Sequence, residues 1–296
     1  MMSSLVRVHG PIARAKKKSR MGARMNRAAK GSAVTPAILS LLLVLLVVIT
    51  AYVFASGDFK APPPITDIGK QVDHQYALTL VVTSIVFVLS QLGLAWVIFR
   101  YRDRGQKAQY NHGNTKFEAI WTTATIVLFV GLGLMAHHAW AVTHLQPAGA
   151  DALQIEVTAN QFVFNFRYAG PDGKFGRLDP KQVSASSGNP VGLDSADPNA
   201  KDDIVVPTLT IPVNREIELL IRSQDVIHNF YVRELRLQQD AVPGMVIPIH
   251  FTATQVGRYD ILCTQLCGLG HYKMHSFLDV VSEQDYQAFL KQQASQ

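Results

Sequence analysis

The chain has 296 residues, of which 48% are hydrophobic and 17% are charged, against about 25% charged in an ordinary soluble domain. This low charge indicates that part of the chain lies in lipid. The formal net charge of +6 is unevenly divided, because residues 1–36 hold nine cations and no acid, whereas residues 137–296 hold 12 cations and 17 acids. A basic tail before an acidic half argues against a general nucleic-acid-binding protein. Two cysteines exclude a disulfide scaffold.

Three apolar stretches without Asp, Glu, Lys or Arg are each long enough to cross a bilayer, which takes about 20 residues. They cover residues 37–55, 76–99 and, at least, 119–136. The tail and the 100–118 loop are rich in Lys and Arg, so the positive-inside rule places both in the cytoplasm. Three crossings then put the C-terminal part on the outer, periplasmic side of a bacterial-type inner or plasma membrane.

The first apolar stretch has two interpretations. Its charged flank, its apolar run and the small residues Ala55 and Ser56 are typical of a cleaved signal peptide. The run is longer than the usual signal-peptide core, which favours a retained helix. The predicted organisation is a basic cytoplasmic tail (1–36), an N-terminal transmembrane helix or signal peptide (37–55), a transmembrane helix hairpin (71–145) and an extracytoplasmic domain (150–296).

After residue 150 the pattern is that of short strands rich in β-branched and aromatic residues, separated by Pro, Gly, Asn and Asp. Strands are predicted at 154–158, 161–168, 216–222, 257–263 and 275–281. The interval 169–203 is predicted to be a polar loop or insertion. Ser282 followed by Asp285 is a capping signal for a short helix that ends near Gln292.

The residues that carry chemistry lie in the segment 263–274, which packs Cys263, Cys267, His271 and Met274 into twelve residues. A further histidine, His228, lies 35 residues before the first cysteine, at the end of a predicted strand. Thiolate and imidazole ligands select copper, zinc or iron–sulfur centres, and a thioether recurs in copper electron-transfer sites. A second cysteine supplies another bridging thiolate, which suits two copper ions that share both sulfurs.

This arrangement resembles cytochrome c oxidase subunit II, the haem–copper oxidase subunit that holds a binuclear copper A site. The family pattern C-x-E-x-C-G-x-x-H-x-x-M is matched over residues 263–274 at every position except the glutamate. The stretches D-V-I-H-N-F at 225–230, D-A-V-P-G at 240–244 and K-F-E-A-I-W at 116–121 are also family-like. The resemblance covers roughly residues 71–290. It implies a membrane α-helical hairpin, with a possible extra N-terminal helix, followed by an all-β cupredoxin-like sandwich.

The resemblance also implies a set of copper ligands. These are the side chains of His228, Cys263, Cys267, His271 and Met274 and the backbone carbonyl of Gln265. A carbonyl ligand survives the change from the family's glutamate to glutamine. In the family that glutamate also contacts a magnesium ion at the interface with subunit I, and a neutral amide is a poorer partner for a hard cation. A magnesium site is therefore not predicted.

The electron donor implied by the resemblance is a c-type cytochrome. The family presents a tryptophan-rich run near the copper, and the corresponding run here is 160–166, in which Phe162 is the candidate position where electrons enter. Ordinary strand packing is the alternative role of Phe162. Met245 replaces a family arginine, which points to a different c-type cytochrome as donor. An acidic group either attracts a cationic donor or forms a solvated loop; it consists of Asp194, Asp197, Asp202 and Asp203.

The function implied is the electron-accepting subunit of a terminal oxidase. It passes electrons from cytochrome c to the haems of subunit I, for oxygen reduction coupled to proton translocation. No residue of this chain is predicted to be catalytic, and the oxygen chemistry is expected on another subunit. Expected partners are subunit I, other oxidase subunits, the donor and the membrane, with no nucleic acid. Two alternatives stay open, namely the copper A subunit of a nitric-oxide reductase and a membrane-tethered copper chaperone or assembly protein.

Overall fold

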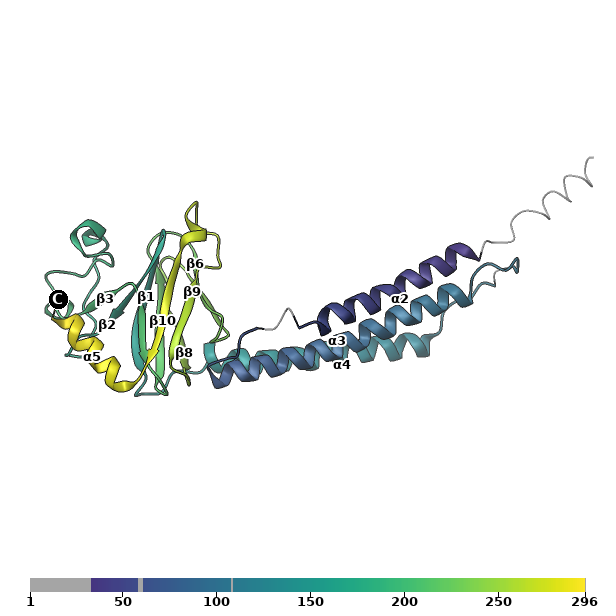
Figure 1. The fold of residues 1–296 in the computed structure, drawn as a ribbon, viewed down its shortest axis with the longest axis horizontal. Coiled ribbons are helices and arrows are strands. Elements are labelled where there is room, and N and C mark those ends of the chain that lie inside the picture. Colours follow the sequence, from purple (N-terminus) through teal and green to yellow (C-terminus); the bar gives the residue numbers. More distant parts are fainter. Residues whose placement is uncertain (1–32, 58–60, 108, 296) are drawn as a thin grey trace, which may run out of the picture. The chain divides into compact units, whose positions relative to one another are not determined.

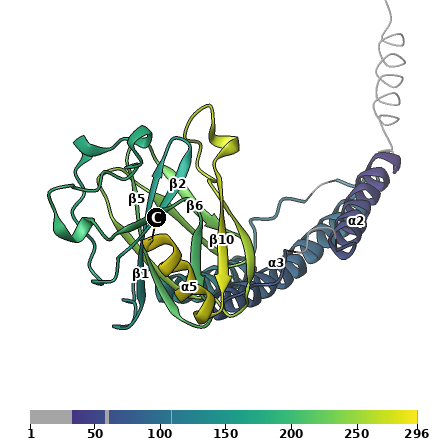
Figure 2. The ribbon, with the colours of Figure 1, turned by 60° about the vertical axis from the view of Figure 1, so that its left-hand side comes forward.

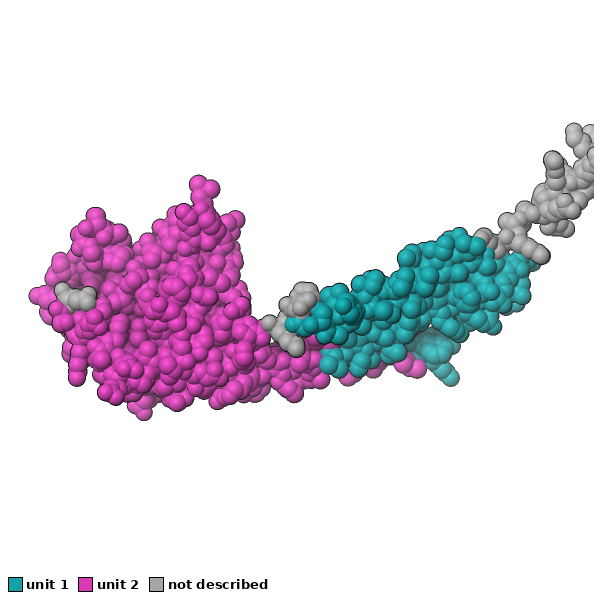
Figure 3. All heavy atoms as spheres, in the orientation of Figure 1, with its two compact units in different colours: residues 1–60, 81–119 teal, residues 61–80, 120–296 magenta. Residues whose placement is uncertain are grey.

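The computed structural model describes residues 33–57, 61–107 and 109–295, which form three long helices, a β domain and a C-terminal helix (Figure 1). The chain divides into two compact units, one of residues 1–60 and 81–119 and one of residues 61–80 and 120–296 (Figure 3). The basic tail predicted over residues 1–36 lies outside the described residues as far as residue 32.

The three apolar stretches are confirmed as helices. They are α2 (Val34–Ala55), α3 (Asp67–Arg100) and α4 (Thr115–His144), and each is long and apolar enough to cross a membrane. Each helix is longer than its uncharged stretch, because the polar residues that flank the stretch continue the helical backbone. Within the first unit, the Ser40 hydroxyl of α2 donates a hydrogen bond of 2.9 Å to the carbonyl of Ala95 in α3.

The β domain is a sandwich of two five-stranded sheets. The first sheet has the order β3-β2-β1-β5-β8, and the second has the order β4-β10-β9-β6-β7. The strands are β1 (Leu153–Asn160), β2 (Val163–Tyr168), β3 (Ile204–Val206), β4 (Leu209–Pro212), β5 (Glu216–Ser223), β6 (His228–Val232), β7 (Leu237–Ala241), β8 (Ile247–Thr252), β9 (Gly257–Leu262) and β10 (His275–Val281). The C-terminal helix α5 (Glu283–Ala294), yellow in Figures 1 and 2, packs against β3 and β4.

The predicted strands appear as β1, β2, β5, β9 and β10, and Ser282 caps α5 as expected, its Oγ accepting from the Asp285 amide at 3.1 Å. The other five strands were not predicted. One reason is visible at β8, where Pro248 interrupts the sequence pattern; β8 pairs only with β5, and an edge strand tolerates proline. His228 begins β6 rather than ending a strand, which corrects the prediction.

The core lies between the sheets, where alternate residues of each strand point inward. Ile155, Val157 and Ala159 of β1 face Phe230 and Leu278 of the second sheet in one buried cluster. The outward-facing residues of β1 are also buried, because the insertion 169–203 covers that face. The insertion contains three short 3-10 turns, at Pro180–Gln182, Ala185–Ser187 and Pro198–Ala200.

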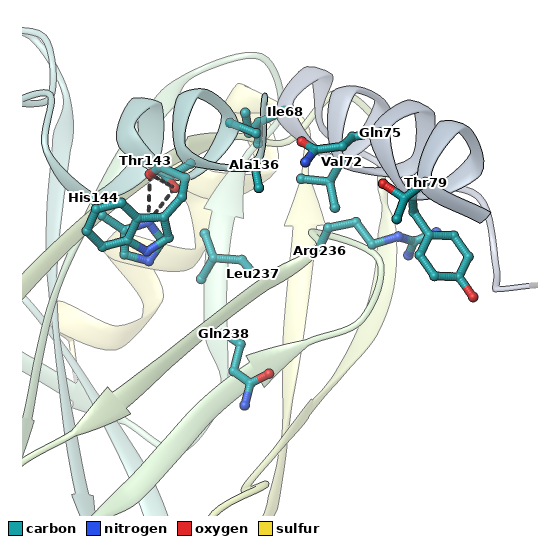
Figure 4. A pocket seen from close by; sticks show the side chains of 13 residues that line it. Ile68, Val72, Gln75, Thr79, Ala136, Thr143, His144, Arg236, Leu237 and Gln238 are labelled. Atoms are coloured by element: carbon teal, nitrogen blue, oxygen red, sulfur yellow. Dashed lines mark hydrogen bonds between the residues drawn. The ribbon is translucent and has the colours of Figure 1, made fainter. Parts of the chain in front are cut away.

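The second unit also includes residues 67–80 of α3 and 120–144 of α4, and polar contacts fix their ends to the sheets. Arg236 Nε donates to Asp73 of α3 at 2.7 Å. His250 of β8 contacts the carbonyl of Val142 in α4 at 2.9 Å through Nε2 and Glu216 at 2.8 Å through Nδ1. A pocket of about 470 Å³ lies where these helix turns meet the loop at Arg236 (Figure 4).

An aromatic cluster joins α5 to the sandwich. The Tyr168 hydroxyl donates to the Thr210 carbonyl at 2.9 Å and accepts from the Thr210 amide at 2.7 Å, so β2 of one sheet satisfies the free edge of β4 in the other. The rings of Tyr168 and Phe289 meet edge-on at 5.6 Å, and Tyr286 is 1% exposed beside them. Burial raises the pKa of Tyr286 to about 12 and that of Tyr168 well above its ordinary value.

Replacing Tyr286 by Phe tests this burial. Because the folded-state pKa lies above the unfolded value of about 10, the stabilisation is complete below about pH 10 and is lost as the pH rises from about 10 to about 12. The Tyr286→Phe variant keeps the ring and removes this titration. Its calorimetric unfolding temperature should therefore match that of the parent chain at pH 8 and fall less steeply above pH 10. Parallel curves for the two proteins would contradict the assignment.

Candidate metal centre

The candidate centre lies at one end of the sandwich, where the loop between β9 and β10 forms the yellow-green projection at the top of the β domain in Figure 1. This Cys loop comprises residues 263–274. Cys263 follows β9 directly, so its position is set by the sheet, and its amide donates to the Met274 carbonyl at 3.2 Å. That hydrogen bond closes the base of the loop.

Two sulfurs occupy the middle of the centre. Cys263 and Cys267 are buried and their Sγ atoms are 3.8 Å apart, so no disulfide joins them. Burial, with the neighbouring Cys263 thiol as a further cause, raises the pKa of Cys267 to about 11. The Cys267 thiol therefore stays protonated near neutral pH unless a cation displaces the proton, which is how thiolate metal sites form.

The remaining predicted ligand atoms surround these sulfurs. His271 Nδ1 is 3.5 Å and Met274 Sδ is 3.9 Å from Cys267 Sγ, and the Gln265 carbonyl oxygen is 3.2 Å from Cys263 Sγ. A short 3-10 turn at His271–Lys273 turns His271 and Met274 toward the same side. The structure thus brings all of these atoms together, although the sequence separates the first and last by eleven residues.

His228 completes the cluster from a different strand. It is 0% exposed, and one of its ring nitrogens lies within 4.8 Å of both sulfurs. Its Nε2 is 2.8 Å from Asp225 Oδ1, so Nε2 carries the proton, while Nδ1 is buried and has no hydrogen-bond partner among the described residues. An unpartnered buried nitrogen beside two thiols is suited to metal binding, and nitrogen, thiolate and thioether donors together suit copper.

Asp225 controls which nitrogen of His228 is free. Burial raises the pKa of Asp225. Hydrogen bonds from His228 and from the amides of Gln161 and Val226 together lower the pKa by more than burial raises it, so it lies below its ordinary value. The carboxylate is therefore charged and fixes the imidazole tautomer, as the outer partner of a histidine ligand commonly does. Asp225 was not singled out from the sequence, although it lies three residues before His228 in the family-like stretch.

Two further contacts missed from the sequence hold the Cys loop. Gln161 Nε2 donates to the Cys267 carbonyl at 2.5 Å, and Thr264 Oγ1 donates to Asn229 Oδ1 at 2.6 Å. Gln161 lies in the β1–β2 turn and Asn229 in β6, both far from the loop in sequence, so no local sequence signal marks them. The Gln265 side chain is exposed, and His275 turns away from Met274 to Asp260 at 2.8 Å, as strand alternation predicts.

Phe162 lies against the Cys loop. A Cβ at Gly270 would be 2.4 Å from Phe162 Cδ2, and one at Gly268 would be 2.7 Å from Gln161 Nε2. Gly268 also has a φ of +138°, which side chains rarely adopt. The two glycines thus allow the β1–β2 turn to touch the loop, and Phe162 stays 36% exposed above it.

The acidic group lies elsewhere and its charges are used internally. Asp203 is paired with buried Arg167 at 2.9 Å, and Asp194 and Asp197 contact Arg177 at 3.1 and 3.5 Å. Three of the four acids are thus paired with arginines, while Asp202 accepts from the Asp172 amide at 3.3 Å; attraction of a cationic donor by this group stays a prediction.

Comparison with known proteins identifies the family. Residues 195–283 match the model for "Cytochrome C oxidase subunit II, periplasmic domain". An alternative cytochrome c oxidase subunit 2 of Bradyrhizobium diazoefficiens is 33% identical over 258 residues, which cover 85% of this chain and 91% of the relative. The chain belongs to the cytochrome c oxidase subunit II family.

Other relatives agree with this membership. A cytochrome c oxidase subunit 2 of Thermostichus vulcanus is 29% identical over 276 residues, covering 83% of each chain, and that of Cereibacter sphaeroides is 24% identical over 246 residues, covering 80% of each. The crystal structure of the periplasmic domain of subunit II from Bradyrhizobium japonicum aligns with a TM-score of 0.37 and 24% identity, covering 50% of this chain and 98% of that one.

Family membership settles several expectations at a coarse level. The protein is a component of an oxidoreductase complex and associates with other oxidase subunits. Its apolar helices indicate membrane anchoring, and its C-terminal part is the periplasmic, cupredoxin-like domain of the family. The family, together with the cluster of His228, Cys263 and Cys267, supports copper binding.

Replacing Gly270 by Ala tests the contact between Phe162 and the loop. The φ of Gly270 is −92°, which alanine accepts, so the effect is steric. Forcing a methyl group against the ring should cost about 1–3 kcal/mol of folding free energy. The double variant Phe162→Ala/Gly270→Ala should lose less than the sum of the single variants, because the ring is gone. Additive losses in thermal unfolding would show that the two residues do not touch.

Proposed function

We propose that this subunit accepts single electrons from a c-type cytochrome at a binuclear copper A centre. It then passes them to the haems of subunit I, where oxygen reduction is coupled to proton translocation. The observation that carries the proposal is the pair of buried sulfurs 3.8 Å apart, ringed by two histidine nitrogens, a thioether and a carbonyl oxygen.

Each candidate residue would supply one ligand atom to such a centre. Cys263 and Cys267 would hold the metals through their sulfurs, His228 and His271 through Nδ1, Met274 through Sδ and Gln265 through its backbone carbonyl. Copper held there would supply one-electron transfer with the change of charge spread over two metals.

The protein's own contribution is rigidity and the exclusion of water. Asp225 keeps the proton on Nε2 of His228, so Nδ1 is available without rearrangement. Gln161 and Thr264 fix the backbone of the Cys loop from two directions. A site that does not rearrange when its charge changes transfers electrons at low cost, and preorganisation of this kind is the protein's task at a cofactor.

The copper stoichiometry can be measured on the full chain in detergent after loading with copper. Two copper ions per chain and a seven-line mixed-valence EPR signal are expected. Cys263→Ser should abolish that signal because it removes one bridge. His275→Gln is the matched control: it changes a histidine next to Met274 whose side chain faces Asp260, so the signal should persist. One metal per chain, or zinc without the signal, would refute a binuclear centre.

The two alternative functions differ in what they require of the chain. A copper chaperone must release its metal to a partner, whereas this centre is buried and held by hydrogen bonds with Gln161, Asp225 and Asn229. A nitric-oxide reductase subunit would have the same centre but a different catalytic partner. The named relatives are oxidase subunits, which favours oxygen as the final acceptor. Identifying the haem subunit that co-purifies with the chain distinguishes these cases.

Electrons would enter at an apolar rim formed by Phe162, Leu269 and Tyr272. Leu269 is 98% and Tyr272 is 78% exposed, and Phe162 covers the loop glycines between the surface and the sulfurs. Lys273 is the sole Asp, Glu, Lys or Arg in the Cys loop. Three members of the acidic group are paired with arginines, and the Asp225 carboxylate beside Gln161 is paired with His228, so these acids are already engaged within the protein.

Salt dependence of donor oxidation tests this mode of docking. Electrostatically steered association falls steeply as ionic strength rises, whereas apolar docking does not. With the intact oxidase, the second-order rate for a near-neutral c-type cytochrome should change less than about twofold up to about 0.3 M salt. Leu269→Asp should slow that reaction about tenfold and leave the EPR signal intact. A steep fall with salt in the parent oxidase would contradict an uncharged rim.

A further inference from the structure

A second hollow, of about 370 Å³, lies apart from the metal centre between the outer face of the first sheet and the insertion. Its floor is formed by Thr158 of β1 and by Arg222, Ser223 and Gln224 at the end of β5. Its size is at the lower end of the range for small-molecule sites, about 300–1,000 Å³.

The basic group on the floor lacks a full set of partners. Arg222 is paired in register with Thr158 on the neighbouring parallel strand, and both point away from the core. Among the described residues, the nearest acid to its guanidinium is Glu156 at 3.9 Å, and the guanidinium forms no hydrogen bond. Glu156 accepts hydrogen bonds from two nitrogens of Arg167, so its contact with Arg222 is only a long ion pair and the Arg222 guanidinium keeps donors for a ligand.

A neutral polar group adjoins this arginine. Thr158 is 1% exposed, and its hydroxyl has no hydrogen-bond partner in the part of the chain that the structure describes. Buried polar groups are nearly always hydrogen-bonded, so an unpaired one in the wall of a hollow points to a missing partner. An arginine beside a hydroxyl on one strand pair suits an oxyanion.

The side of the hollow formed by the insertion is apolar, and hydrogen bonds hold it in place. It includes Leu178, Val183 and Val191 of the insertion. The Asn189 side chain holds this part of the insertion, since Nδ2 donates to the carbonyls of Gln182 and Leu193 at 3.1 and 3.0 Å and Oδ1 accepts from the Leu193 amide at 2.7 Å. The hollow is therefore bounded by hydrogen-bonded structure rather than by an open loop.

We propose that this hollow binds a small organic carboxylate with a compact apolar group. The carboxylate would face Arg222, whose planar fork matches two carboxylate oxygens, and would accept from the Thr158 hydroxyl. The apolar group would lie along Leu178, Val183 and Val191, where a purely inorganic anion finds no partner. This proposal concerns a site separate from the copper centre and does not depend on the function proposed for it.

Benzoate is the probe for this site, with benzamide as the uncharged control and acetate as the control without an apolar group. Saturation-transfer NMR on the full chain in detergent should detect benzoate binding with a Kd of about 1 mM. Benzamide and acetate should bind much more weakly. Arg222→Gln should weaken benzoate binding at least about tenfold, and Arg258→Gln, which changes a surface arginine paired with Asp279 on the other sheet, should leave it unchanged.

Thr158→Val removes the hydroxyl at nearly constant shape and should also weaken binding. Val183→Trp fills the hollow from a side chain that is 40% exposed, so it should block benzoate without disturbing the core. Three results would overturn the proposal: equal binding of benzamide, benzoate binding unchanged by Arg222→Gln or Val183→Trp, or no benzoate binding up to its solubility limit.

Discussion

The end of the β domain that carries the Cys loop is organised around two buried thiols, 3.8 Å apart, beside a buried histidine nitrogen that has no partner among the described residues. Neither feature is favourable in a bare protein. Burial raises the pKa of Cys267, and the unpaired nitrogen of His228 forgoes a hydrogen bond. Such a cluster persists because the surrounding sheets hold it, and it becomes favourable once a metal replaces the thiol protons.

Three separate segments provide that support, and they are linked to one another. The Gln161 amide donates to Asp225 at 2.8 Å while its side chain holds Cys267, so one residue of the β1–β2 turn connects the histidine side of the centre to the cysteine side. On the far side, Asn229 accepts from Thr264 and donates to Asp240 at 2.6 Å. The loop that carries most of the ligand atoms is thereby fixed by strands from both sheets.

Several charged residues of this domain pair with one another beneath the insertion rather than lying free around the Cys loop. Arg167 is buried on the outer face of the first sheet and holds Glu156 and Asp203, and its guanidinium lies 4.8 Å from the ring of Phe175. Acidic residues of the insertion are thus paired with arginines of the same domain, although the composition alone suggests that they could bind a cationic partner. The excess of negative charge in residues 137–296 is real, but it does not describe the surface around the Cys loop.

The sequence by itself determined the apolar helices, the strands with clear alternation and the candidate metal ligands, because each of these is a local pattern. An uncharged run can be identified from the sequence without knowing which segments it contacts. C-x-x-x-C followed by histidine and methionine likewise places four donor atoms within twelve residues. The capping signal at Ser282 was equally local. Weakly patterned strands such as β7 and β8 were missed because pairing with neighbours, rather than their own residues, makes them strands.

Only the tertiary structure decided how those donors are held and what else surrounds them. Gln161 and Asn229 act across 106 and 35 residues of sequence, separations that no spacing rule covers. The burial of the acids under the insertion, and the hollow beside Arg222, likewise follow from which sheet face the insertion covers. The physical reason is common to all of them: hydrogen bonds and burial depend on distance in space, and the parallel pairing of β1 with β5 sets those distances between segments far apart in the chain.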